Sequence, residues 1–258
     1  MLRAAGATLI ALMLAACAAP GPGHPPGEPF DPYEARNRTA HAFNKSLDRA
    51  ILRPVSRGYS AAMPDDIENA IGRFAANLSI PRSVVNNILQ GNMKGATADT
   101  YRFLVNTTVG LGGFFDPATE LGMPAATDAD FGQTLFVWGV REGAYIETPF
   151  FGPSTERDAA GWVVDIFTNP LRYAIGTPDW YWSSAARASA ALSRRGRFSD
   201  SIDSILYESA DSYAQTRSLY LQNRHFQLGA GAGAAYLDPY DDPYARTDES
   251  PDASSDTE

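Results

Sequence analysis

Apolar residues recur every three or four positions through most of the chain, which is the spacing of amphipathic helices. The first such stripe consists of Phe43, Leu47 and Ile51. We expect Asp31 to cap this helix and Pro54 to end it, because aspartate is a preferred N-cap and proline interrupts a helix.

The same spacing continues along the chain. It predicts further helices over residues 65–78, 81–91, 95–109, 130–139, 155–169 and 200–228. Asp130 and Thr155 are expected as N-caps, and a segment headed by Trp180, Tyr181 and Trp182 ends in a cluster of arginines. Residues 144–151 alone have extended character, so a short strand or an irregular loop is expected there. The pattern therefore predicts a mainly α fold.

One segment interrupts this pattern. Gly110, Gly112 and Gly113 follow a helical run, and each costs about 1 kcal/mol in a helix relative to alanine, so the helix should end or bend there. The neighbouring side chains are apolar: Val109, Leu111, Phe114 and Phe115. The segment is either a buried turn between core helices or an apolar lip that touches lipid.

The charge of the chain is concentrated at its C-terminal end. The net charge is −9, and residues 238–258 hold eight acidic residues against one arginine, which leaves −2 for the rest. The near-neutral remainder shows no basic face for a nucleic acid. We expect residues 230–258 to be a disordered acidic tail.

The N-terminal end resembles a bacterial lipoprotein leader. An apolar run too short to anchor a mature protein ends in Leu14-Ala15-Ala16-Cys17, and Cys17 is the only cysteine of the chain. We expect residues 1–16 to be a signal peptide, Cys17 to carry the lipid, and residues 17–30 to form a Pro/Gly-rich tether. A single cysteine also excludes an internal disulfide.

Many short motifs occur in one order along residues 31–229. They include Asp31-Pro32-Tyr33-Glu34, Phe43-Asn44, Leu52-Arg53-Pro54-Val55, Leu89-Gln90-Gly91, Arg102 to Pro117, Asp130-Phe131-Gly132-Gln133, and Gly152-Pro153-Ser154-Thr155 with Arg157-Asp158. Together they resemble the MlaA (VacJ) family of outer-membrane phospholipid-transport lipoproteins. The match is weaker between residues 167 and 198, and the acidic tail is not part of the pattern.

The resemblance implies a single ring-like helical domain over residues 31–229, with amphipathic helices lying in the periplasmic leaflet of the outer membrane. It implies a non-enzymatic component that removes misplaced phospholipids from the outer leaflet, passes them to a soluble, MlaC-like periplasmic carrier, acts beside a trimeric porin and maintains lipid asymmetry. No cofactor is expected other than the covalently attached lipid at Cys17.

The glycine segment is the expected hinge of the lipid passage. The expected passage residues are Phe43, Asn44, Val109, Leu111, Phe114, Phe115, Arg157 and Asp158. Arg157 with Asp158 is either a surface ion pair of little energetic value or a pair in which Arg157 guides a phosphate headgroup. The aromatic cluster near Trp180 is either a headgroup contact or an ordinary core cluster.

Two other functions remain open. A structural lipoprotein could fasten a porin or the cell envelope without moving lipid. A phospholipid hydrolase would use Ser154 with Asp158 or His225, although Ser154 is better explained as part of a helix start. The three histidines, His24, His41 and His225, show no spacing typical of a metal site, so no metal is expected.

Overall fold

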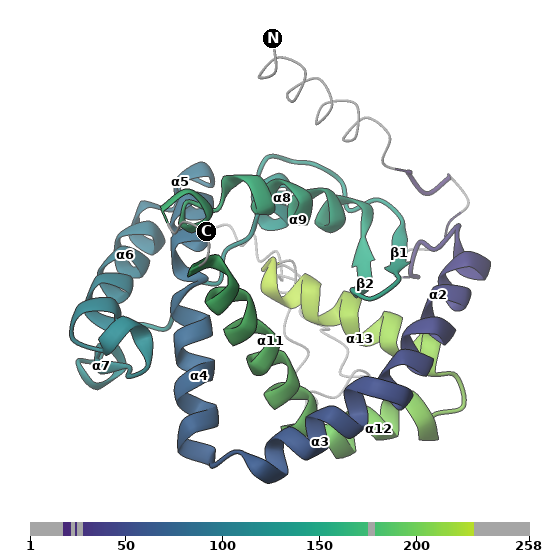
Figure 1. The fold of residues 1–258 in the computed structure, drawn as a ribbon. Coiled ribbons are helices and arrows are strands. Elements are labelled where there is room, and N and C mark those ends of the chain that lie inside the picture. The colour runs from purple at the N-terminus through teal and green to yellow at the C-terminus, as the bar shows by residue number, and fades with distance from the viewer. Residues whose placement is uncertain (1–17, 22–23, 25–27, 175–178, 230–258) are drawn as a thin grey trace, which may run out of the picture. The chain divides into compact units, whose positions relative to one another are not determined.

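The structure is a computed structural model that describes residues 18–21, 24, 28–174 and 179–229 (Figure 1). The predicted signal peptide, Cys17 and the acidic tail lie outside these residues. The chain divides into two compact units, residues 1–221 and 222–258. The described residues form helices and one β-hairpin, which confirms the predicted mainly α class.

The first helical region runs without a break past Pro54. Helix α2 (Glu34–Leu47) continues through a π turn, η1 (Asp48–Leu52), into α3 (Arg53–Ala62). Pro54 follows a π turn in which the Arg53 N–H bonds to the Asp48 carbonyl, and the helix continues through it, so the predicted stop at Pro54 is wrong. Asp31 is not the N-cap either, because Tyr33 holds that position.

The next three helices follow the predicted pattern. They are α4 (Asp65–Asn77), α5 (Ile80–Leu89) and α6 (Met93–Thr108). Gly91 adopts φ +74° just after α5, and the Asn92 side chain caps α6 by accepting the Gly95 N–H. Helix α5 packs along α6.

The chain then turns through the glycines as η2 (Leu111–Gly113) into a short helix, α7 (Pro117–Glu120). Helix α8 (Phe131–Val137) is capped by Asp130, as predicted, and packs on α9 (Glu156–Thr168), which Thr155 caps. Between them, β1 (Tyr145–Thr148) pairs antiparallel with β2 (Gly152–Thr155). The extended character of residues 144–151 thus corresponds to β1 and the hairpin turn, and β2 was not predicted.

The last helices are shorter than their periodicity indicated. They are α10 (Leu171–Ala174), α11 (Asp179–Arg197), α12 (Ser199–Asp203), a π turn η3 (Ser204–Glu208) and α13 (Ser212–Gln227). The single helix expected over 200–228 is therefore wrong, because the chain becomes extended at Ser209. Helix α11 lies along both α3 and α4 (Figure 1).

The burial of side chains is inverted relative to a water-soluble helical protein. Half of the buried apolar residues are alanines, and buried polar residues outnumber buried apolar ones among the described positions. Helix α6 illustrates this: Asp99, Arg102 and Asn106 are buried, whereas Tyr101 and Leu104 are exposed. The apolar stripe of α2 follows the same rule, since Phe43 is exposed.

Many of the buried polar groups bind one another. Arg102 donates to Asp116 at 2.6 Å, and Asn106 donates to the same carboxylate at 2.9 Å. Asn86 donates to Asp165 at 2.9 Å across α5 and α9. Because an unpaired buried polar group is costly, these networks fix the packing of the helices in place of a large apolar core.

Candidate functional site

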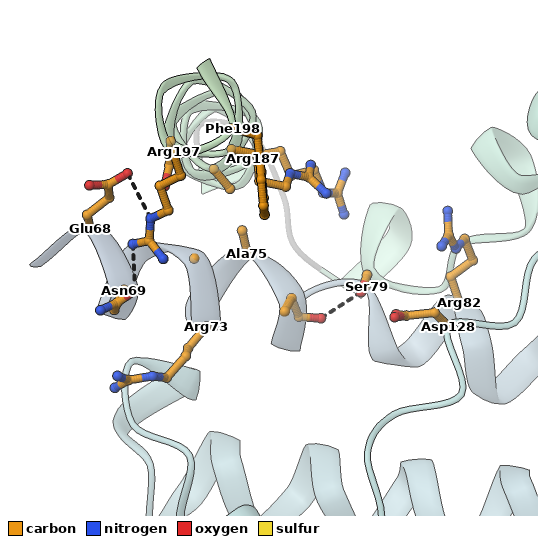
Figure 2. Close-up of a pocket in the computed structure, with 15 residues that line it drawn as sticks. Glu68, Asn69, Arg73, Ala75, Ser79, Arg82, Asp128, Arg187, Arg197 and Phe198 are labelled. Carbon is orange, nitrogen blue, oxygen red and sulfur yellow. Dashed lines mark hydrogen bonds and ion pairs between the residues drawn. The ribbon is translucent and has the colours of Figure 1, made fainter. Parts of the chain in front are cut away.

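A cavity of about 700 Å³ lies between α4 and α11, with residues from α5 at one end. Arginine dominates its charged lining: Arg73, Arg82, Arg187, Arg194 and Arg197, against Glu68 and Asp128. Figure 2 shows Arg197 with Glu68 at one end of the cavity and Arg82 with Asp128 at the other. The cavity is thus strongly cationic inside a chain whose net charge is −9.

At one end of the cavity, Arg197 is paired with polar side chains of α4. Arg197 Nε lies 3.4 Å from Glu68 Oε1, whose side chain is buried, and Arg197 Nη2 donates to Asn69 at 2.5 Å. These contacts join the C-terminal end of α11 to the first turn of α4.

A second cavity of about 260 Å³ adjoins the first. Ser79, Arg82 and Arg187 line both cavities, and Trp162, Asp165 and Arg172 are among the residues that line only the second. Arg82 and Arg187 therefore stand at the junction of the two cavities.

The glycine segment forms the outer part of the site. Val109 and Leu111 are about two-thirds exposed and Phe115 is 56% exposed, while Phe114 stacks on Phe74 with ring centroids 4.7 Å apart. The buried turn is therefore excluded, and an exposed apolar lip is present. A third cavity, of about 440 Å³, lies beside Val109 and Phe115 and is also lined by Arg73.

The glycines hold this lip in a fixed turn. Asn77 donates to the Gly112 carbonyl at 3.0 Å, and Gly110 O accepts from the Phe115 N–H at 3.0 Å. A Cβ at Gly110 would lie 2.6 Å from the Phe115 carbonyl oxygen, and one at Gly113 would lie 2.7 Å from Asn77 Cγ. These glycines are explained by close approach and by φ of +79° and +102° at Gly112 and Gly113, and the predicted hinge motion stays a prediction.

Gly113→Ala should destabilise the protein by about 2–4 kcal/mol, since the new methyl both strains a positive φ and displaces the Asn77 amide from its hydrogen bonds. Gly122→Ala is the matched control, because Gly122 has φ +72° and open space around it. Urea unfolding in detergent measures both variants. Equal losses of unfolding free energy for the two variants would show that the close approach of Gly113 to Asn77 does not add to the cost.

Phe43 and Asn44 lie beside the hairpin. The Phe43 ring meets Phe150 edge-on at 5.1 Å, and Asn44 both donates to Thr148 O at 3.0 Å and accepts the Phe150 N–H at 2.8 Å. The two residues fix a turn that presents Phe150 and Phe151, each about 70% exposed. They do not meet the glycine segment in any contact seen among the described residues, so their place in the passage stays a prediction.

Arg157 and Asp158 form a buried pair. Arg157 is 2% exposed, its Nε donates to Asp158 at 3.3 Å, and Tyr220 donates to the other Asp158 oxygen at 2.9 Å. The surface ion pair considered from the sequence is therefore wrong, because these contacts bury the pair between α9 and the first half of α13. Neither residue lines the three cavities above, so a headgroup contact by Arg157 stays a prediction.

The aromatic and arginine clusters of α11 have different environments. Tyr181 is 68% exposed, which excludes a core position for it, and the side chains of Trp180 and Trp182 lie outside the described residues. Arg194 and Arg197 line the first cavity, whereas Arg195 is buried between Asp48 and Asp203.

A serine, a histidine and a carboxylate do align, though not those considered from the sequence. His41 lies 3.0 Å from Ser212 Oγ and 3.0 Å from Glu147, whereas the Ser154 hydroxyl donates to the neighbouring Thr155 carbonyl. Lys45 Nζ donates to the same Ser212 oxygen at 3.3 Å. The Asp211 carboxylate already occupies the Ala214 N–H, so the first turn of α13 is not open as an oxyanion hole.

Sequence reasoning missed Arg82 and Arg187. Arg82 had a usable signal, because a cation in the first turn of α5 opposes the positive end of the helix dipole and so needs a reason to be there. Arg187 gave no such signal in the sequence, since an arginine within an alanine-rich helix looks like an ordinary exposed residue. Only the packing of α11 on α4 brings the two to one junction.

No helix among the described residues is both long and apolar enough to cross a bilayer. The fold and the site thus define a class: a mainly helical protein with a cationic cavity inside and large apolar side chains outside. The family model of the MlaA lipoprotein matches residues 29–227, and the chain belongs to this family.

Curated relatives support the same family assignment. The intermembrane phospholipid transport system lipoprotein MlaA of Escherichia coli K12 is 33% identical over 220 residues, which is 84% of each chain. An uncharacterized protein of Rickettsia felis is 40% identical over 147 residues, and there the match spans only 58% of the relative's length. A solved structure described as the structural basis for maintenance of bacterial outer membrane lipid asymmetry matches with a TM-score of 0.66 and 33% identity, over 77% of this chain and 98% of that one.

Proposed function

We propose that this protein is a phospholipid-transport lipoprotein that takes misplaced phospholipids from the outer leaflet of the outer membrane and so maintains lipid asymmetry. The observation that carries the proposal is the inverted arrangement: a cationic cavity enclosed by helices whose large apolar side chains are exposed. Exposed apolar surface of this extent is rare on water-soluble monomers. The family membership and the transport function named for the Escherichia coli relative support the same function.

The arrangement fits the physical problem of moving a phospholipid. A charged headgroup cannot enter hydrocarbon cheaply and needs a polar route, while its acyl chains need apolar surface. The cavity between α4 and α11 offers the first, and the lip of Val109, Leu111 and Phe115 offers the second. The glycine turn beside Arg73 brings the two within one region of the chain.

The finer parts of the proposal concern place and partners. We place the protein on the periplasmic leaflet of the outer membrane, held by lipid at Cys17, where it hands phospholipid to a soluble periplasmic carrier beside a trimeric porin. The lipobox sequence Leu14-Ala15-Ala16-Cys17 and the exposed apolar residues support the location. The carrier and the porin follow from the family resemblance alone.

Cys17→Ser should abolish acylation, because the cysteine sulfur is the atom that carries the lipid. Metabolic labelling with a radioactive fatty acid measures it, and the variant should lose all label. Persisting acyl label would contradict the assignment of Cys17.

A hydrolase is the enzymatic alternative, and the Ser212, His41 and Glu147 arrangement is the specific observation that could favour it. We expect purified protein to release no fatty acid from phospholipid and to leave Ser212 unlabelled by a fluorophosphonate, because the Ala214 N–H near that hydroxyl already binds the Asp211 carboxylate. Labelling that disappears in Ser212→Ala would establish the hydrolase instead.

The proposed function is tested by the outer-leaflet phospholipid content of cells that lack the gene, against cells complemented with the intact protein. A rise on deletion that complementation reverses is the expected result. No change would favour a structural lipoprotein that only fastens a porin or the envelope.

A further inference from the structure

Arg82 is a partly buried cation whose Nε has no hydrogen-bond partner among the described residues. Its Nε is enclosed and donates no hydrogen bond, and no ion pair joins its guanidinium to a carboxylate in the part of the chain that the structure describes. An enclosed N–H that makes no hydrogen bond is costly unless something binds it. A ligand anion would remove that cost.

The surroundings of Arg82 raise the local positive potential further. Arg187 reaches the same junction from α11 and donates to the Leu78 carbonyl at 3.5 Å, and burial together with the charge of Arg82 lowers the pKa of Arg187. Arg82 also lies in the first turn of α5, at the positive end of the helix dipole. Two guanidinium groups and a helix N-terminus therefore all contribute positive potential at the junction of the two cavities.

The nearby carboxylates offset only part of this charge, although the positive charge of Arg82 acts on both Asp128 and Asp165: burial raises the pKa of each, and the charge of Arg82 acts to lower it. Asp128 lies beside Arg82 in Figure 2 without an ion pair to it, and Asp165 is committed to Asn86 at 2.9 Å and to the Phe131 N–H at 3.1 Å. The two cavities together are lined by six arginines and three acidic residues. A net positive charge remains for a ligand.

We propose that Arg82 and Arg187 form a phosphate-binding subsite at the junction of the two cavities. The proposal rests on the proposed function, which it deepens by naming where the phosphate of the transported molecule is held. Guanidinium groups suit phosphate because their paired N–H donors match two phosphate oxygens.

The position favours a phosphodiester. A diester carries a substituent on each side of its phosphorus, and Arg82 and Arg187 line both a cavity of about 700 Å³ and one of about 260 Å³. A phospholipid headgroup and free phosphate share the anionic chemistry, and they differ in these substituents.

The test measures binding to the full-length, acylated protein purified in detergent. Titration calorimetry uses inorganic phosphate, glycerophosphoethanolamine and a short-chain phosphatidylglycerol below its critical micelle concentration, each at matched ionic strength in chloride. We expect Arg82→Gln and Arg187→Gln each to weaken binding roughly tenfold or more, as for the loss of a charge-assisted hydrogen bond. Arg36→Gln removes the same charge from an exposed position outside the cavities and should leave binding unchanged.

Unchanged binding in both glutamine variants would overturn the proposal. If either variant fails to fold, thermal stabilisation of the intact protein decides: phosphate should raise its melting temperature above that in chloride, since a ligand of the folded state stabilises it, and no rise would overturn the proposal. Arg82→Lys keeps the charge but not the paired donors, so its affinity should lie between that of the intact protein and that of Arg82→Gln. Tighter binding of the short-chain lipid identifies a headgroup as the source, and equal affinities identify free phosphate.

These readouts are independent of transport. The proposed function fails if deletion leaves the outer-leaflet phospholipid unchanged, whereas the subsite fails if soluble phosphate compounds bind the variants as well as the intact protein.

Discussion

Leu111→Asp with Phe115→Asp should weaken the binding of the protein to phospholipid vesicles by about thirtyfold or more. The two side chains are 67% and 56% exposed, and moving what remains exposed into hydrocarbon contributes about 2–4 kcal/mol in sum. The fold should survive. Leu111 has φ +51°, a conformation that aspartate tolerates better than leucine, and the turn uses the backbone N–H of Phe115 rather than its ring.

The measurement is vesicle co-sedimentation of protein that lacks residues 1–16 and carries Cys17→Ser, because attached acyl chains would mask the contribution of the lip. Thr39→Asp with Ser201→Asp adds the same charge at exposed polar positions and should change the affinity by less than about threefold. Equal losses for the two double variants would mean that charge repulsion, and not the apolar lip, governs binding.

Arg195→Met should have the largest effect on stability, a loss of about 3–5 kcal/mol in the free energy of unfolding. Arg195 donates to Asp48 through two nitrogens at 2.8 Å each and to Asp203 at 2.7 Å, and it holds α11 to the π turn after α2 and to α12. Methionine fills the space of the side chain but leaves two buried carboxylates near each other. Arg49→Met, which removes an exposed arginine that lies over the Tyr207 ring, should cost less than about 1 kcal/mol.

The same network makes the protein sensitive to acid. Burial alone would raise the pKa of Asp48, but hydrogen bonds from Arg195 and Tyr207 hold it below its usual value, and Asp203 is lowered in the same way by Arg195 and Arg53. A carboxyl whose pKa is depressed in the folded state adds stability above its unfolded-state pKa of about 3.9, and this stability is lost as the pH falls. Urea unfolding between pH 7 and pH 3 should show this loss in the intact protein and a much smaller one in Arg195→Met.

The helices and their caps could be predicted from the sequence because they depend on local chemistry. Asp130 and Thr155 cap α8 and α9 as expected, since an aspartate or threonine oxygen finds the third N–H of its own helix. The wrong N-cap prediction at Asp31 came mainly from contacts with residues distant in sequence. Asp31 is drawn from a capping role by Asn37, Tyr213 and Arg217, which bind both of its oxygens.

The direction of burial could not be predicted from the periodicity. An apolar stripe marks one face of a helix, but it does not say whether that face meets a core or a membrane. In α6 the opposite face, with Asp99, Arg102 and Asn106 at spacings of three and four, is the buried one. A polar stripe as regular as an apolar one was the available signal.

Only one part of the candidate site could be predicted from the sequence. The exposed lip could be predicted because glycines and phenylalanines are adjacent in sequence, from Val109 to Phe115. The cavity could not, because it is assembled from α4, α5 and α11, which only tertiary packing brings together. Its ion pair joins residues more than a hundred positions apart, Glu68 and Arg197.

The central claim is that phospholipid passes through the cavity between α4 and α11, and reversible blocking of that cavity tests it most directly. Cys17 is the only natural cysteine and is expected to be acylated, so Ala190→Cys places a single free thiol on the cavity wall. Ala185→Cys places one on an exposed position of the same helix that does not line the cavity. Cells complemented with either variant are treated with a bulky methanethiosulfonate reagent, and their outer-leaflet phospholipid is measured. The account predicts a rise for Ala190→Cys alone, reversed when a reductant removes the reagent; an unchanged leaflet with the Ala190→Cys thiol fully modified would contradict it.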